Sequence, residues 1–92
     1  MIYTGTNIRI EIDTEMDLSG ATDATIRWRR RGQSGEWQAQ TDGETIYYDT
    51  QADDLDVPSV WEFQGVFTLN GKTLKTEIVK HTIYSPIPKP TE

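Results

Sequence analysis

The stretch Trp61-Glu62-Phe63-Gln64-Gly65-Val66-Phe67-Thr68-Leu69-Asn70-Gly71-Lys72-Thr73-Leu74 decides the fold. Apolar side chains recur at every second position before the Asn-Gly pair, which is the pattern of a strand with one buried face. Asn-Gly favours a type I′ turn, because both residues between the strands must adopt a positive φ. A two-residue loop then places Phe67 opposite Leu74 and Phe63 opposite Ile78. The stretch therefore predicts an antiparallel hairpin whose apolar residues face each other.

The segment after this hairpin changes face. Leu74 and Ile78 share one parity, whereas Val79 and Ile83 have the other. A shift of one residue turns every side chain of a strand to the opposite face. The conflict therefore predicts a β-bulge or a change of sheet near residues 77–80.

A second hairpin is predicted at Asp42-Gly43, another pair of residues that favours a type I′ turn. If these two residues form the loop, Trp37 faces Tyr48 and Ala39 faces Ile46. The paired positions are then apolar on both strands, which supports this register.

Two earlier segments also alternate with a period of two, residues 8–13 and residues 24–30. Together with the hairpins they predict an all-β fold: a single antiparallel, immunoglobulin-like β-sandwich of about seven strands over residues 1–85. The sandwich has no disulfide, because the chain has no cysteine. Residues 49–58 lack a strand pattern and predict a connection with a short helical turn.

The C-terminus differs in composition from the rest of the chain. Three of the four prolines in the chain lie within its last seven residues: Pro86, Pro88 and Pro90. Alternating prolines cannot pair in a sheet and favour a polyproline II conformation. Residues 86–92 are therefore predicted to form an extended arm.

Composition excludes several classes of protein. The chain has 92 residues and a net charge of −6, which argues against binding to a phosphate backbone. It contains no apolar run of the ~18 residues that a membrane span needs. Its first residues lack the basic and apolar regions of a secretory signal. We expect a small module that binds neither nucleic acid nor membranes.

Catalytic chemistry has few candidate residues. His81 is the only histidine, and no serine lies in a nucleophile elbow. The carboxylates of residues 11–17 and of residues 49–56 do not follow the spacing of a calcium-binding loop. We therefore predict no catalytic residue, no cofactor and no metal ligand, although an ion in the acidic connection 49–56 stays open.

An arginine row is the first candidate binding site. Arg27, Arg29 and Arg31 are predicted to project from one face of a strand, with Trp28 on the opposite face. Such a row could bind phosphate, contact a neighbouring subunit or pair with the acidic segment 11–17. The negative net charge favours the last two possibilities.

The aromatic residues are the second candidate. Trp28, Trp37 and Trp61, with Tyr47 and Tyr48, could form a platform for sugars if they were exposed on one flat face. The predicted registers instead place Trp37 and Trp61 on the side that faces the core. Core packing is therefore favoured, and a carbohydrate- or host-receptor-binding module is the alternative function.

Several motifs resemble those of one family. Five segments resemble parts of small bacteriophage virion domains: Asp17-Leu18-Ser19-Gly20-Ala21-Thr22, the strand that follows it, residues 48–55, Trp61-Glu62-Phe63-Gln64 and Thr82-Ile83-Tyr84. They are similar in style to the N-terminal domain of siphophage baseplate upper proteins. The resemblance implies an immunoglobulin-like fold and a non-enzymatic structural role, and it supplies no catalytic residue.

This resemblance sets the functional expectation. We expect a subunit of the virion that is made in the host cytoplasm and forms a homo-oligomer or a multi-copy assembly. It is expected to dock on other phage structural proteins in the tail, baseplate or neck or on the capsid surface. Edge strands, the arginine row and the arm are the candidate contacts. In the arm, the predicted contact residues are Pro86, Pro88, Lys89 and Pro90.

Overall fold

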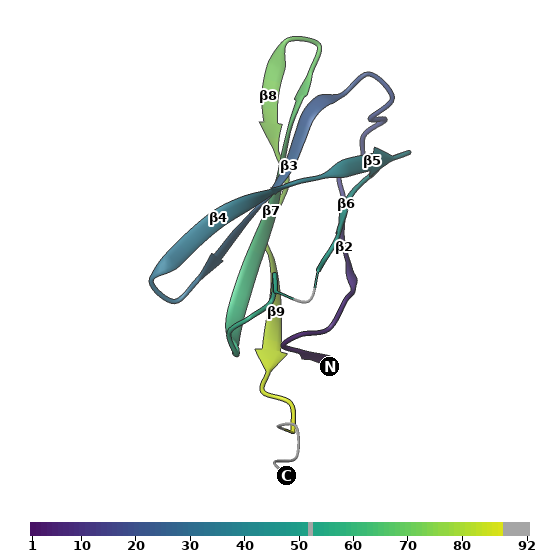
Figure 1. The fold of residues 1–92 in the computed structure, drawn as a ribbon. Coiled ribbons are helices and arrows are strands. Elements are labelled where there is room, and N and C mark those ends of the chain that lie inside the picture. The colour runs from purple at the N-terminus through teal and green to yellow at the C-terminus, as the bar shows by residue number, and fades with distance from the viewer. Residues whose placement is uncertain (52, 88–92) are drawn as a thin grey trace.

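A computed structural model describes residues 1–51 and 53–87 of the chain. These residues form nine β-strands and no helix, and thus no helix that could cross a membrane (Figure 1). The prediction of an all-β fold is confirmed. The number of strands exceeds the expected seven or so, because strands of only two or three residues are too short to show alternation in the sequence. The strands are β1 (Ile2–Tyr3), β2 (Arg9–Asp13), β3 (Thr22–Arg30), β4 (Gln33–Gln38), β5 (Gln40–Asp42), β6 (Thr45–Asp49), β7 (Ser59–Leu69), β8 (Lys72–Lys75) and β9 (Val79–Tyr84).

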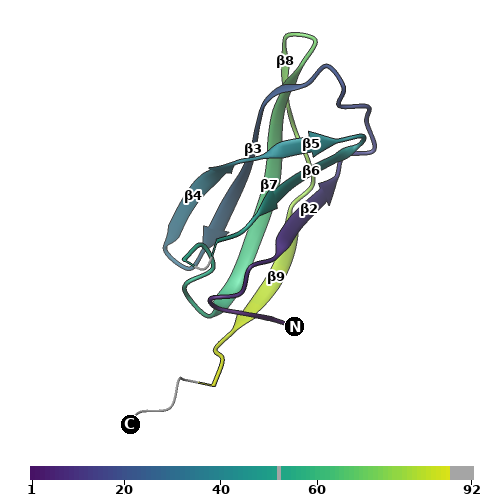
Figure 2. The same cartoon turned by 45° about the vertical axis from the view of Figure 1, so that its right-hand side comes forward.

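The strands form two sheets (Figure 2). The larger has the order β1-β9-β7-β3-β4, with β8 also paired to β7, and the smaller has the order β2-β6-β5. All pairs are antiparallel except β1 and β9, which are parallel with Ile2 opposite Ile83. The predicted antiparallel arrangement therefore holds for every pair but this one, and the larger sheet is mixed.

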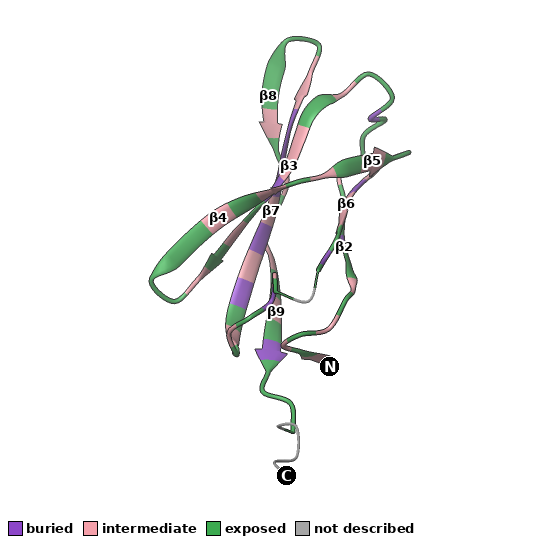
Figure 3. Cartoon of the chain, in the orientation of Figure 1, coloured by how far each residue is buried: buried purple, intermediate pink, exposed green. Residues whose placement is uncertain are grey.

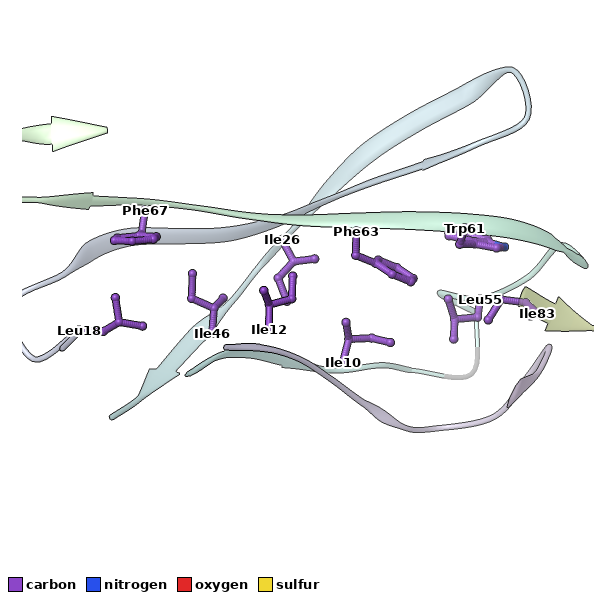
Figure 4. Close-up of a cluster of buried hydrophobic side chains, with 10 residues drawn as sticks. All are labelled: Ile10, Ile12, Leu18, Ile26, Ile46, Leu55, Trp61, Phe63, Phe67 and Ile83. Atoms are coloured by element: carbon purple, nitrogen blue, oxygen red, sulfur yellow. The ribbon is translucent and has the colours of Figure 1, made fainter. Parts of the chain in front are cut away.

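The two sheets enclose one hydrophobic core (Figure 4). Burial alternates along much of β7, so that every second residue of this central strand faces the core (Figure 3). The predicted core residues Trp61, Phe63 and Phe67 are all at most 2% exposed. The remaining members of the buried cluster are Ile10, Ile12, Leu18, Ile26, Ile46, Leu55 and Ile83.

The β7–β8 hairpin has the predicted register. Phe67 lies opposite Leu74, and the loop residues Asn70 and Gly71 have φ values of 53° and 76°. A positive φ at both loop residues is the requirement of a type I′ turn. The predicted turn and the predicted pairing of Phe67 with Leu74 are confirmed.

A bulge separates β8 from β9. Lys75 lies opposite Val66 and Val79 lies opposite Phe63, so residues 76–78 face only two residues of β7. The predicted change of face is therefore confirmed, one residue earlier than expected. The predicted pairing of Phe63 with Ile78 is wrong, because the extra residue moves Ile78 out of the ladder and leaves it 47% exposed.

The second hairpin differs from its prediction. The closing pair is Asp42 and Thr45, so the loop is Gly43-Glu44, and among these positions only Gly43 has a positive φ, 62°. Trp37 pairs with Ile26 of β3 and not with Tyr48. The reason is that the chain leaves the larger sheet at Ala39, between β4 and β5, and enters the smaller one.

The connection between β6 and β7, for which the sequence predicts a short helical turn, contains a hydrogen-bonded turn and no helix among its described residues. Among its described residues, the Asp54 N–H donates to the Gln51 carbonyl over 3.0 Å. Leu55 is fully buried, and the Trp61 indole N–H donates to the Val57 carbonyl over 2.9 Å. The connection therefore closes one end of the core.

Candidate functional site

The outer face of the larger sheet carries two of the predicted site residues, Arg27 and Arg29. Ile26 and Trp28 point towards the core, so the alternate residues Arg27 and Arg29 point away from it. Their opposite residues on the neighbouring strands share this face, because paired residues project to the same side. These residues are Ser34, Glu36, Glu62 and Gln64.

Both arginines of this face form cross-strand ion pairs. Arg29 Nε lies 3.0 Å from Glu62 Oε1, and Arg27 Nε lies 3.8 Å from Glu36 Oε2. The hydrogen bond from Arg29 lowers the pKa of the Glu62 carboxyl, and the charge of Lys80 acts in the same direction. The positive charge is therefore balanced within the sheet, which weakens the interpretation of the row as a phosphate site.

The expected pairing with the acidic segment 11–17 is wrong in its partners. That segment begins on β2, which belongs to the smaller sheet. The carboxylates that meet the arginines come from β4 and β7, the direct neighbours of β3. Strand alternation could reveal the arginine face, but only the strand order could reveal its partners.

Arg31 does not belong to the row. The β3–β4 hairpin closes with Arg30 opposite Gln33, so Arg31 and Gly32 form its loop, and Gly32 has a φ of 72°. A two-residue loop ends the alternation of the strand. The prediction that Arg31 projects with Arg27 and Arg29 is therefore wrong.

Arg30 has the role that sequence reasoning missed. Its guanidinium lies 5.2 Å from the centroid of the Trp61 ring and 5.7 Å from that of Trp28. Its Nη2 donates to Gln33 Oε1 over 2.7 Å, and its side chain is only 13% exposed. Arg30 has the parity of Ile26 and Trp28, which was the available signal that it covers the core and not the surface.

A groove lies on the outer face beside the ion pairs. It has a volume of about 510 Å³, and its lining includes Arg27, Arg29, Glu36, Glu62 and Ile78. Ile78 supplies apolar surface between charged groups whose positions are set by cross-strand pairing. Such a combination suits a protein partner better than a phosphate.

Exposed apolar residues concentrate on the same face. Of the seven large hydrophobic side chains that are exposed in the described residues, four lie there. They form what we call the outer patch, which consists of Tyr3, Val60, Ile78 and Tyr84. The rings of Tyr3 and Tyr84 lie 5.9 Å apart and extend the patch over β1 and β9. Its signal in the sequence was the parity conflict at Ile78.

The aromatic residues form a layer under this sheet. Trp37 stacks on Tyr48 with ring centroids 4.7 Å apart, although the two residues are not paired in any sheet. The Tyr48 hydroxyl donates to Asp54 Oδ2 over 2.7 Å. Burial, with this hydrogen bond, raises the pKa of Tyr48 to about 12. Trp28 and Trp37 are only partly buried, so part of this layer reaches the surface.

The acidic residues mainly stabilise loops and pair with cations. Asp49 accepts a hydrogen bond from Arg9 Nε over 2.7 Å, which lowers the pKa of its carboxyl. Asp17 accepts one from the Ser19 N–H over 2.9 Å, with the same effect on its pKa. Within residues 1–51 and 53–87, no three carboxylate or histidine side chains come together as a metal site would require.

The segments that carry the resemblance have clear structural roles. Leu18, next to Asp17, is 2% exposed, and its N–H donates to the Gly43 carbonyl over 3.0 Å. The loop at residues 17–22 therefore places a buried side chain under the turn between β5 and β6 of the smaller sheet.

The C-terminal arm is described only in part. Pro86 and Ile87 are exposed, whereas the predicted contacts Pro88, Lys89 and Pro90 lie outside the described residues.

In comparisons with protein-family models, curated proteins and solved structures, nothing matches this chain.

Proposed function

We propose that the chain is a non-enzymatic structural subunit of a bacteriophage particle that docks on neighbouring particle proteins. The outer patch is the observation that carries this proposal. Four exposed apolar side chains share one face of the larger sheet with two pairs of oppositely charged residues. Apolar patches with a polar rim are typical of protein-binding surfaces.

We also propose that the fold is an immunoglobulin-like sandwich. Two facing sheets, a central strand β7 and a core of large aliphatic and aromatic residues support an immunoglobulin-like sandwich without a disulfide. The virion assignment rests on the resemblance of residues 17–22, 61–64 and 82–84 to small phage domains. The candidate positions on the particle are the tail, the baseplate, the neck and the capsid surface.

The decisive experiment compares two single substitutions at exposed apolar residues. Ile78→Asp places a charge in the groove, whereas Met16→Asp changes an apolar residue of similar exposure, 40% against 47%, outside the patch. We expect Ile78→Asp to reduce incorporation into particles at least tenfold and Met16→Asp to leave it unchanged. Incorporation is measured by quantitative mass spectrometry of particles purified from the host that carries this coding sequence.

Both variants must retain the melting temperature of the unmodified chain for this comparison to count. Equal incorporation of the two variants would show that the outer patch is not the docking surface. Absence of the unmodified chain from purified particles would overturn the virion assignment itself. If the chain is present in the particles, a reconstruction of them would identify the neighbouring subunit.

A carbohydrate- or host-receptor-binding module is the second candidate. It is favoured by the partial exposure of Trp28 and Trp37, because sugars stack on accessible indole faces. Against it, Trp37 already stacks on Tyr48, and Trp28 lies against Trp61 at 5.2 Å. A glycan array with the unmodified chain separates the candidates, since specific binding that is lost in Trp37→Ala would support the second.

A further inference from the structure

Within the part of the chain that the structure describes, strand β4 has one edge that pairs with no other strand. Its six residues pair only with β3. The Ala39 N–H donates to the Ala24 carbonyl, and hydrogen-bonded pairs alternate along an antiparallel ladder, so residues 33, 35 and 37 bond to β3. The N–H and C=O groups of Ser34, Glu36 and Gln38 therefore point away from the sheet and are free to bond to another strand.

The other edges of the described sheets are short or charged. β1 has two residues and β5 has three. Three of the five residues in β2 are charged, and two of the four in β8 are lysines. Charges and short length are the usual devices that prevent edge pairing. β4 has one charge, Glu36, and neither lysine nor proline.

We propose that β4 pairs in antiparallel fashion with β4 of a second copy of this chain, around a two-fold axis through Gly35. In this register Ser34 lies opposite Glu36 of the second copy, and Glu36 lies opposite its Ser34. The two hydrogen-bonded pairs supply four main-chain bonds. The inference deepens the proposed structural role by naming one partner, a second copy of the chain. Only the presence of this dimer in a particle rests on the proposed function.

Charge complementarity selects this register. Across the joined sheets, one row contains Glu62, Arg29 and Ser34 of one copy followed by Glu36, Arg27 and Gln64 of the second. Positive and negative groups alternate along the row, and each ion pair within a copy remains intact. A shift of one pair towards Glu36 would place the two Glu36 side chains opposite each other, which is unfavourable. The opposite shift would place Ser34 opposite its counterpart and would remove both contacts between Ser34 and Glu36.

Gly35 suits a position on the axis. A Cβ atom there would lie 2.5 Å from the Trp28 ring, so the indole covers the glycine on the inner face. Pairing Gly35 with its counterpart brings the two copies of Trp28 together beneath the joined sheet. Buried tryptophan surface then adds to the main-chain bonds.

Sedimentation velocity of the full chain tests the proposal. Concentrations should extend to about 1 mM, because an interface under about 1,200 Å² is typically weak. We expect the unmodified chain to shift from monomer to dimer as its concentration rises. Glu36→Pro should weaken the dimer at least tenfold without loss of a β3–β4 bond, because its N–H points away from β3.

Glu11→Pro is the matched control. Its N–H also points away from its sheet. Ile8 accepts a hydrogen bond from the Thr50 N–H and Thr14 donates one to the Glu44 carbonyl, so the even-numbered residues form the hydrogen-bonded pairs with β6 and the odd-numbered Glu11 does not. It should dimerise like the unmodified chain. The register is tested by charge: Ser34→Glu should weaken the dimer and Ser34→Lys should preserve or strengthen it.

Hydrogen exchange of the unmodified chain gives a second measurement that needs no variant. The amides of Ser34 and Glu36 should gain protection as the concentration rises, whereas that of Glu11 should not. A monomer at every concentration, or equal weakening by Glu36→Pro and Glu11→Pro, would overturn the proposal. Neither result would alter the particle experiment with Ile78→Asp, so the two proposals fail separately.

Discussion

The β7–β8 and β5–β6 hairpins both have two-residue loops that contain glycine, but their registers have different causes. In β7–β8 the turn signal and the apolar pattern agree, and the predicted register holds up to the bulge that follows Lys75. In β5–β6 the observed loop is Gly43-Glu44 and not Asp42-Gly43. This shift preserves the face of every side chain, since Ile46 lies opposite Thr41 where Ala39 was expected. The apolar pattern could not distinguish the two registers.

Contacts from distant segments select the observed β5–β6 register. The Leu18 N–H donates to the Gly43 carbonyl over 3.0 Å, and the Thr14 N–H donates to the Glu44 carbonyl over 2.8 Å. At the other end, β3 pairs with Trp37 in the larger sheet. A hairpin with matching local signals forms as its sequence predicts, whereas one shared between two sheets is set by its neighbours.

The largest effect is expected where both hairpins depend on one residue. Phe63 is fully buried on the central strand β7, so Phe63→Ala should cost about 3–5 kcal/mol. Total stability of a domain of this kind is about 5–15 kcal/mol, so both hairpins should lose their protection together. Urea denaturation followed by circular dichroism measures the loss, and an unchanged midpoint would contradict the placement of Phe63 in the core.

Leu18→Ala should separate the two hairpins. Loss of this buried side chain should cost about 2–5 kcal/mol and loosen the loop that contacts Gly43. Amide hydrogen exchange should therefore accelerate more in β5–β6 than in β7–β8. Equal acceleration in the two hairpins would show that the Leu18 loop does not select the register.

Gly71→Val tests the locally encoded turn. No other group lies within 4 Å of a Cβ at this position, so the cost arises from the φ of 76° and not from a clash. A β-branched residue in this conformation should destabilise the fold by about 1–3 kcal/mol. Gly71→Asn is the control, because asparagine tolerates positive φ, and it should cost less by thermal denaturation.

Alkaline pH should weaken the layer that joins the sheets. The pKa of Tyr48 is about 12 in the folded chain, above the ordinary value of about 10. Because the folded pKa is raised, the stabilisation is complete below pH of about 10 and is lost as the pH rises through about 12. The melting temperature of Tyr48→Phe should therefore fall less steeply over this range. Parallel curves would contradict the role of Tyr48.

The smallest effect is expected in acid. The pKa values of Asp17 and Asp49 are lowered by hydrogen bonds from Ser19 and Arg9. Their contribution is present above the ordinary pKa of about 3.9 and is lost as the pH falls through the lower folded values. Both groups are exposed, so the melting temperature should change by only a few degrees. If the melting temperature of Asp17→Asn falls less in acid than that of the unmodified chain, the difference is the contribution of the Asp17 carboxylate.

The candidate site shows the same division between local and distant causes. Strand alternation placed Arg27 and Arg29 on the outer face, but it could not supply their partners Glu36 and Glu62, which come from other strands. Arg31 was misplaced because the end of β3 depends on the hairpin loop. The outer patch was missed because its members come from three separate segments of the chain, at β1, at β7 and around β9.

The sequence by itself determined most of the strands, the β7–β8 turn, the bulge before β9 and the central core residues Trp61, Phe63 and Phe67, but neither β1 nor the division between β4 and β5. These features depend on side-chain parity and on the φ preferences of adjacent residues, which are local properties. The tertiary structure alone decided the sheet order, the crossing at Ala39, the partners of the arginines and the edge left open on β4. Each of these depends on which strands become neighbours, and many strand orders satisfy the same alternation.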